Sequence, residues 1–257
     1  MTTSSRIAGR FAALAAQGRK AVIPYIVAGD PLPDVTVPLM HRLVEAGADI
    51  IELGVPFSDP MAEGPVIQRG HERALACGIR LRDALQMVAE FRASDTETPV
   101  LLMGYSNPVV GMGYAAFADR ARSVGLDALL TVDMPPEEVD ALNAELKRVG
   151  IDNIFLVAPT TPAERVRKIT DVATGFVYYV SLKGVTGAGH MDAQDVATHV
   201  ALIRQHSNLP VAVGFGIKDA ASAARIARDA DGVVIGSALV QRLADCVDAG
   251  GDAAAVL

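Results

Sequence analysis

The sequence predicts an α/β fold: one (β/α)8 barrel over residues 1–257, with an additional helix before the first strand. Short apolar runs recur along the whole chain, and amphipathic segments lie between them. Eight runs over 257 residues correspond to about 32 residues per unit, which suits a repeated βα unit of a TIM barrel. A doubly wound open sheet is the alternative, and the absence of a G-x-G-x-x-G pattern after the first run disfavours it.

The first predicted element is an amphipathic helix within residues 1–20. Arg6 and Arg10 lie where a signal peptide would need apolar residues, and the apolar run at 11–16 is too short for its core. No stretch approaches 18 uninterrupted apolar residues, so we expect no membrane segment. These features are typical of a cytoplasmic protein.

The predicted strands are short runs that are apolar on both faces, as expected for parallel strands buried on each side. The segments between them carry apolar residues three and four apart, and several open with proline or acidic residues, as helices do. The strands are expected at 21–28, 49–53, 99–103, 127–132, 152–157, 175–180, 209–213 and 231–235, and the clearest helices at 32–47, 136–150, 163–173 and 220–230.

One pattern repeats before three of these strands. A helix is followed by glycine, one further residue, aspartate and then an apolar run. Gly47, Gly125 and Gly150 are the glycines, and their position predicts helix ends with positive φ.

Composition excludes several classes of protein. With 23 basic and 30 acidic residues, the formal net charge of −7 argues against a nucleic-acid-binding protein. Cys77 and Cys246 are far apart, and no cysteine or histidine spacing indicates a metal site. We therefore expect a protein of a reducing compartment with no bound metal.

Glycine clusters follow the last three predicted strands, at 183–189, 214–217 and 236–237. Functional residues of such barrels lie at the carboxyl ends of the strands. Glycines let backbone N–H groups approach an anion, and a helix beginning at Ser237 would add its dipole. The three clusters together predict a phosphate site, although each alone would be an ordinary turn.

Acidic residues lie at the same end. Glu52 ends the second strand, and alternation places it inside the barrel if its neighbours face the helices. Burial would raise its pKa toward neutrality, as proton donation and acceptance require. Asp59 and Glu63 in the loop 54–65 are candidates for a second carboxylate. Asp133 is a further candidate or a helix cap.

Tyr178 and Tyr179 are adjacent on the sixth strand and must face opposite ways, so one can enter the site while the other packs against helices. Lys183, after this strand, suggests an alternative chemistry, because a lysine there can form a Schiff base with a carbonyl substrate.

Several segments together resemble the α subunits of tryptophan synthases along nearly the whole chain. These are YIVAGDP (25–31), IELGVPFSDPMAEGPVIQ (51–68), GVTGAG (184–189), VGFGI (213–217) and IGSALV (235–240). The resemblance implies retro-aldol cleavage of indole-3-glycerol phosphate to indole and glyceraldehyde 3-phosphate, a step of tryptophan biosynthesis, with no cofactor on this chain.

The resemblance also implies roles for individual residues. Glu52 matches the principal acid-base carboxylate, Tyr178 an active-site tyrosine, and Glu63 a position where the family more often has aspartate to hold the indole N–H. The implied substrate-binding residues are Tyr25, Met103, Leu130 and Phe215 around indole, Thr186 in a closing loop, and Gly187, Gly216, Gly236 and Ser237 at the phosphate.

The implied partner is a β subunit that carries pyridoxal phosphate, in an αββα heterotetramer. The loop segments 59–65 and 108–114 are candidates for this contact.

Two other functions are weighed against the lyase: a Schiff-base sugar-phosphate aldolase that uses Lys183, and a non-catalytic phosphate-binding regulatory barrel. A sugar-phosphate isomerase is disfavoured, because the apolar positions near Tyr25 and Phe215 suit an aromatic ring.

Overall fold

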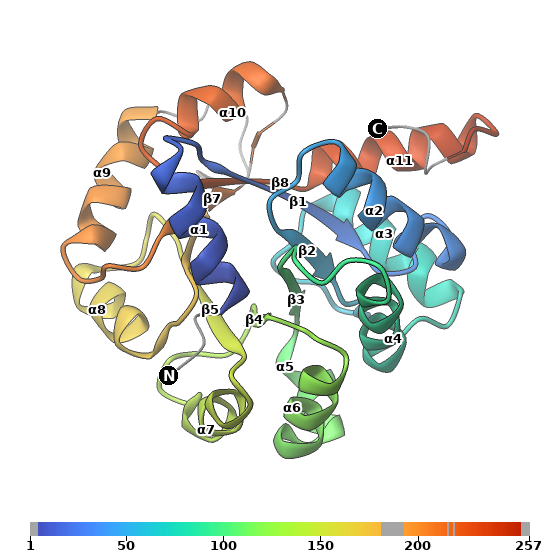
Figure 1. Cartoon of the computed structure of the whole chain (residues 1–257), viewed down its shortest axis with the longest axis horizontal. Coiled ribbons are helices and arrows are strands. Elements are labelled where there is room, and N and C mark those ends of the chain that lie inside the picture. Colours follow the sequence, from blue (N-terminus) through green and yellow to red (C-terminus); the bar gives the residue numbers. More distant parts are fainter. Residues whose placement is uncertain (1–4, 181–192, 215, 218, 253–257) are drawn as a thin grey trace.

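Eight parallel strands form a closed barrel in sequence order, β1 to β8, surrounded by helices (Figure 1). The computed structural model describes residues 5–180, 193–214, 216–217 and 219–252. Pairing of Ala21 with Gly232 joins β1 to β8 and closes the ring. The predicted barrel is therefore confirmed.

Each strand overlaps one predicted apolar run. All eight are parallel, so their carboxyl ends meet at one end of the barrel, which we call the catalytic end. The strands are β1 (Ala21–Val27), β2 (Ile51–Gly54), β3 (Val100–Gly104), β4 (Ala128–Thr131), β5 (Asp152–Val157), β6 (Val177–Val180), β7 (Val211–Gly214) and β8 (Gly232–Ile235).

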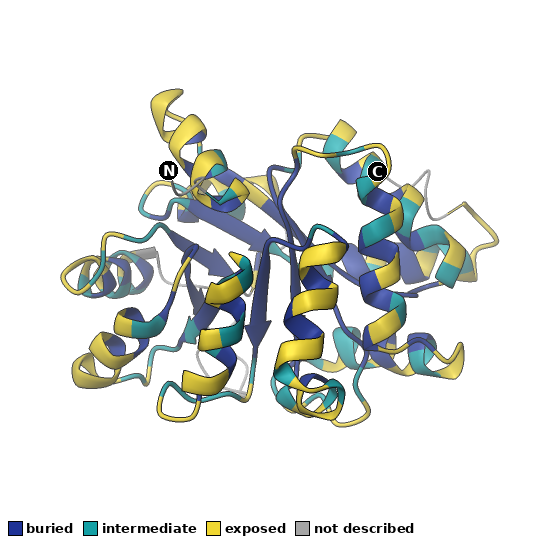
Figure 2. Cartoon of the chain, turned by 60° about the horizontal axis from the view of Figure 1, so that its bottom comes forward, coloured by how far each residue is buried: buried dark blue, intermediate teal, exposed yellow. Residues whose placement is uncertain are grey.

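The helices cover the outside of the barrel, with buried inner faces and exposed outer faces (Figure 2). None of those in the described ranges is long and apolar enough to cross a membrane. They are α1 (Arg6–Ala16), the 3-10 helix η1 (Pro33–Val35), α2 (Thr36–Glu45), α3 (Pro65–Ala76), α4 (Leu81–Arg92), α5 (Ser106–Met112), α6 (Tyr114–Ser123), α7 (Asp140–Val149), α8 (Ala163–Val172), α9 (Ala193–Arg204), α10 (Ala220–Ile226) and α11 (Ser237–Asp248).

Two predicted helices begin later than the sequence pattern indicates. The segment expected from 32 starts as η1 and becomes α-helical at Thr36, and the segment expected from 136 begins at Asp140 after a turn. Both segments open with Pro and acidic residues, which suit a turn as well as a first helical turn. The predicted N-terminal helix is α1.

The repeated glycine-aspartate pattern has a structural role. Gly47, Gly125 and Gly150 adopt positive φ angles of 102°, 78° and 74°, as predicted. The aspartates two residues after the first two glycines accept hydrogen bonds from the backbone of the preceding strand. Asp49 accepts the N–H of Val22 on β1 at 3.0 Å, and Asp127 accepts the N–H of Val100 on β3 at 2.8 Å. The pattern thus ends a helix and secures the register of two neighbouring strands.

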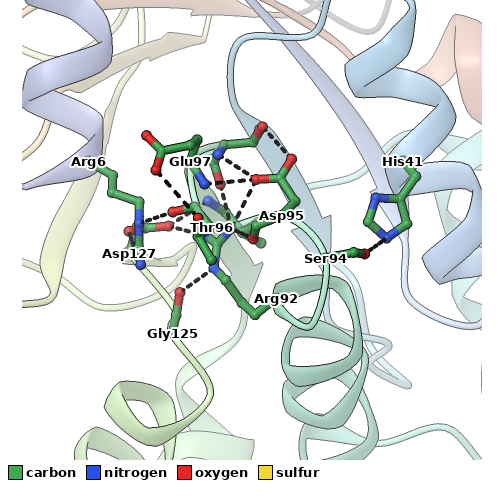
Figure 3. A network of polar contacts seen from close by, with 11 residues as sticks. Arg6, His41, Arg92, Ser94, Asp95, Thr96, Glu97, Gly125 and Asp127 are labelled. Carbon is green, nitrogen blue, oxygen red and sulfur yellow. Dashed lines mark hydrogen bonds and ion pairs between the residues drawn. The ribbon is translucent and has the colours of Figure 1, made fainter.

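Asp127 is also the centre of a polar network at the amino-terminal end of the barrel (Figure 3). Its carboxylate pairs with Arg92 at 2.6 Å and with Arg6 of α1 at 2.7 Å. Arg92 is 9% exposed and donates further bonds to the carbonyl oxygens of Gly125 and Thr98. The network ties α1 to the amino-terminal ends of the strands.

We predict that Asp127→Ala lowers the free energy of unfolding by about 3 kcal/mol, because the buried Arg92 guanidinium loses its 2.6 Å carboxylate partner and is left with the longer 3.8 Å ion pair with Asp95. Denaturant unfolding measures this change. Asp119→Ala is the matched control, since Asp119 also pairs with an arginine at 2.7 Å but its side chain is 64% exposed. Equal losses in both variants would contradict the stabilising role of the network.

Candidate active site

A cavity of about 230 Å3 opens at the catalytic end of the barrel. It is lined from strands far apart in the sequence and from the first turns of α3 and α11. Of the residues predicted for the site, the cavity brings together Tyr25, Glu63, Met103, Tyr178, Gly216, Gly236 and Ser237.

Glu52 lies on β2 in register with Tyr25 of β1, which places both side chains on the inner face of the barrel. Its side chain is buried, with 1% exposure, and no described residue hydrogen-bonds to either carboxylate oxygen. Burial raises the pKa of Glu52 to about 8, and the nearby charge of Glu63 contributes to the rise. Glu52 can therefore both give and take a proton near neutral pH.

Glu63 ends the loop between β2 and α3 and is buried. The hydroxyl of Tyr105, directly after β3, donates a short hydrogen bond to its Oε2 and accepts the N–H of Ala62 at 3.0 Å. Burial raises the pKa of Glu63, while the bond from Tyr105 opposes the rise. Asp59, the other candidate in this loop, is exposed.

Tyr105 was missed by the sequence analysis. Its place directly after an apolar run is the signal that could have indicated it, since the catalytic end begins there. The ring of Tyr105 stacks on Phe57 of the β2–α3 loop, with ring centroids 4.6 Å apart. Tyr105 thus holds the loop that carries Glu63.

The two tyrosines of β6 face opposite ways. Tyr178 lines the cavity, whereas Tyr179 is fully buried against the helices and stacks on His199 of α9, with ring centroids 5.2 Å apart. Burial, with a contribution from the Glu52 charge, raises the pKa of Tyr178 well above its usual value. Tyr178 is therefore a neutral hydroxyl facing Glu52 inside the barrel.

Glycines at the ends of two strands make room for two cavity tyrosines. A Cβ atom at Gly54 would overlap the hydroxyl of Tyr25 and lie 2.6 Å from its Cζ atom. One at Gly214 would overlap the hydroxyl of Tyr178 and lie 2.7 Å from Cζ. Each ring lies across the glycine of the next strand, so both hydroxyls stay inside the barrel.

The far side of the cavity suits an anion. Gly236 and Ser237 form the start of α11, a 12-residue helix whose first N–H groups have no intrahelical partners. Gly216, with φ of 73°, and Ile217 complete this side. The neighbouring first turn of α3 also lines the cavity.

Other predicted residues lie elsewhere. Leu130 is buried on β4 in register with Met103, so the two side chains share the inner face, although Leu130 does not itself line the cavity. Asp133 accepts the N–H of Ser106 at 2.7 Å, so it caps the start of α5 rather than a helix of its own segment. Among the described residues, no cluster of histidine, cysteine or acidic side chains could hold a metal ion. Lys183, Thr186, Gly187 and Phe215 lie outside the described residues.

Glu63 lines the cavity, and Glu52 is buried beside the cavity residue Tyr25. A parallel barrel with two buried carboxylates and a helix N-terminus at one end is typical of an enzyme of the acid-base type, suited to a small anionic substrate. The family model described as "Tryptophan synthase alpha chain" matches residues 11–255. The chain belongs to this family.

Curated relatives named "Tryptophan synthase alpha chain" align with nearly the whole chain. The one from Nitrosococcus oceani is 62% identical over 239 residues, which cover 93% of this chain and 88% of the relative. The one from Thioalkalivibrio sulfidiphilus is 63% identical over 241 residues, covering 94% and 91%.

Solved structures agree with this assignment. The tryptophan synthase subunit alpha of Legionella pneumophila superposes with a TM-score of 0.91 at 46% identity, covering 98% of this chain and 94% of that chain. A chain of the tryptophan synthase complex of Pyrococcus furiosus gives 0.79 at 38% identity, covering 88% and 90%.

We predict that Glu52→Gln stabilises the protein at neutral and alkaline pH but not at acidic pH. The folded-state pKa of about 8 lies above the usual 4.5, so wild-type stability is complete below pH 4.5 and falls as pH rises toward 8. Glutamine does not titrate, so at pH 8 the variant should gain on the order of 4 kcal/mol relative to its difference at pH 4.5.

Denaturant unfolding across this pH range measures the effect. Asp59→Asn, which removes an exposed carboxylate of the adjoining loop, is the control and should follow the wild type at every pH. A constant difference between Glu52→Gln and wild type would show that the pKa of Glu52 is not raised.

Proposed function

We propose that Glu52, Glu63 and Tyr178 carry out the lyase reaction of this tryptophan synthase α chain. The enzyme cleaves a carbon-carbon bond of indole-3-glycerol phosphate and releases indole and glyceraldehyde 3-phosphate. The observation that carries the proposal is the buried Glu52 carboxyl, whose pKa of about 8 lets it exist in either protonation state near neutral pH.

Glu52 acts first as an acid and then as a base. Its proton adds to C3 of the indole ring, which gives a cationic indolium. The resulting carboxylate takes the proton of the hydroxyl on the adjoining chain carbon, the C3–carbon bond breaks, and its electrons return to the ring. The chain leaves as an aldehyde and Glu52 regains its proton, so the cycle is closed.

Glu63 accepts a hydrogen bond from the indole N–H and stabilises the positive charge that the ring carries after protonation. The bond from Tyr105 favours the ionised form of Glu63 and orients it toward the cavity. Tyr178 remains a neutral hydroxyl and donates to oxygen atoms of the substrate chain. Tyr25, Met103, Leu130 and Phe215 surround the ring.

The phosphate binds where α11 begins. Backbone N–H groups of Gly216, Gly236 and Ser237 face the anion, and the helix dipole favours negative charge. Gly187 and Thr186, in the segment after β6, complete the substrate site in this proposal. The distance from Glu52 to the start of α11 is set by the barrel, so the two ends of a phosphorylated substrate are held separately.

The reaction needs no cofactor on this chain, because acid and base come from its own side chains. We propose that the indole passes to a β subunit that carries pyridoxal phosphate, in an αββα assembly in the cytoplasm. Support comes from the Pyrococcus furiosus tryptophan synthase complex, one chain of which resembles this one, and from exposed apolar residues at the catalytic end. Met61 is 82% exposed and Val110 is 52% exposed.

The alternative functions are not favoured. Membership in the tryptophan synthase α family supports the lyase over a Schiff-base aldolase that uses Lys183. Two buried carboxylates with raised pKa values at one end of the barrel favour an enzyme over a purely regulatory barrel.

We predict that Glu52→Gln lowers kcat for indole release by about 10²–10⁴-fold, because it removes the acid-base group. A second substitution tests the phosphate site. Ser237→Asp should raise the KM for indole-3-glycerol phosphate at least about tenfold, because a negative side chain would face the negative phosphate.

Steady-state assays with purified β subunit present measure the kcat of Glu52→Gln and the KM of Ser237→Asp. Retained turnover in Glu52→Gln would exclude its catalytic role, and an unchanged KM in Ser237→Asp would place the phosphate elsewhere.

We predict that Met61→Asp and Val110→Asp weaken activation by the β subunit, because a buried unpaired charge disfavours the interface. The measurement is indole release by the chain alone and at increasing concentrations of β subunit. Ala13→Asp, an exposed position on α1 at the opposite end, is the control. Unchanged activation in both loop variants would exclude these segments from the contact.

A further inference from the structure

A histidine outside the cavity fixes one of the cavity hydroxyls. His71 of α3 is buried, and its Nδ1 accepts the backbone N–H of Phe57 at 3.1 Å. Burial lowers the pKa of His71 to about 4, so the ring is neutral at pH 7. With Nδ1 occupied as an acceptor, the ring proton is on Nε2.

The Nε2 atom of His71 lies 3.2 Å from the hydroxyl oxygen of Tyr25. Because Nε2 carries the proton, His71 donates and Tyr25 accepts. The phenolic proton of Tyr25 is therefore left to donate to another group. Within the part of the chain that the structure describes, Tyr25 has no hydrogen-bond acceptor for this proton.

The acceptor that lacks a donor is on the next strand. Tyr25 and Glu52 are register partners on β1 and β2, and both side chains lie inside the barrel. Neither oxygen of Glu52 receives a hydrogen bond from the described residues. A buried donor and a buried acceptor thus lie on the same inner face of adjacent strands, with no hydrogen bond formed between them in this structure.

The groups around this pair favour the same partnership. Tyr25 is surrounded by Glu63 of the β2–α3 loop, Tyr178 of β6, Tyr105 after β3, and Glu52 itself. Glu63 already receives the proton of Tyr105, and the two tyrosines can act as donors themselves. Glu52 is the acidic group of this set that has no donor.

We propose that Tyr25, oriented by His71, is a positioning residue that donates a hydrogen bond to the Glu52 carboxylate when Glu52 loses its proton. The inference rests on the proposed role of Glu52 as the acid-base group. The bond stabilises the ionised form, so it limits how far burial raises the pKa of Glu52 and keeps the carboxylate facing the hydroxyl that it must deprotonate.

The His71 contacts allow a matched set of variants. Tyr25→Phe removes the donor to Glu52. His71→Asn keeps an acceptor for the Phe57 N–H but is too short to reach Tyr25, whereas His71→Gln keeps a donor at the reach of Nε2. Tyr25→Phe removes the hydroxyl that donates to Glu52, and His71→Asn removes the donor that orients this hydroxyl. His71→Gln is the conservative control.

The experiment is a pH titration of the Glu52 side chain by carboxyl 13C NMR on the whole chain, with the signal assigned by its loss in Glu52→Gln. Tyr25→Phe should raise the pKa of Glu52 by about one unit, because an ionised carboxylate loses a buried hydrogen bond. His71→Asn should shift it in the same direction, and His71→Gln should stay near the wild type. The double variant Tyr25→Phe/His71→Asn should show the shift of Tyr25→Phe alone.

Kinetics supply a second readout. The pH at which kcat/KM for indole release falls to half its maximum on the alkaline side should move upward with the pKa of Glu52 in Tyr25→Phe, because Glu52 begins the reaction as the acid. Unfolding midpoints confirm that the variants fold. An unchanged Glu52 titration in Tyr25→Phe would overturn the proposal. So would a raised KM without a titration shift, because it would assign the hydroxyl to the substrate. Failure of the proposed function is recognised separately, as undiminished turnover in Glu52→Gln.

Discussion

Closure of the strand register is the constraint on which the structure depends. When β1 pairs with β8, all eight strand ends are brought to one rim, and side chains from residue 25 to residue 237 line a single cavity. The inner face of each strand is then shielded from water by the whole ring. A carboxylate placed there, as Glu52 is, loses its hydration and changes its acid-base behaviour.

The two carboxylates of the site have different surroundings for this reason. Glu52 is on a strand, inside the ring, and no described residue donates a hydrogen bond to it. Glu63 is on a loop at the rim, where Tyr105 donates to it and so favours its charged form. Two chemically identical groups at one end of the barrel thus differ in which protonation state the protein stabilises, as the proposed division between proton transfer and charge stabilisation requires.

The polar groups at the two ends of the barrel differ in how completely they are hydrogen-bonded. At the amino-terminal end, Asp127 satisfies two arginines and a strand amide, and every group of this network has a partner (Figure 3). At the catalytic end, polar groups such as Glu52 remain without one. Asp152 and Asn153, at the amino-terminal start of β5, also carry a buried side-chain oxygen without a partner among the described residues. Glu52 differs from them because it lies beside Tyr25, which lines the cavity, so a bound substrate can supply the missing contact.

The sequence by itself determined the architecture, because apolar period, turn glycines and unit length are local properties. The eight strands, α1 and the positive φ angles of Gly47, Gly125 and Gly150 followed from it, and alternation along β2 correctly predicted that Glu52 faces inward. The resemblance of long motifs to one family supplied the substrate, which spacing alone did not. Tertiary structure decided which loop carboxylate is buried, that Tyr105 holds Glu63, and that His71 orients Tyr25. These are contacts between residues 42 to 46 positions apart, and their distances depend on how the helices and loops pack on the closed barrel rather than on any local pattern.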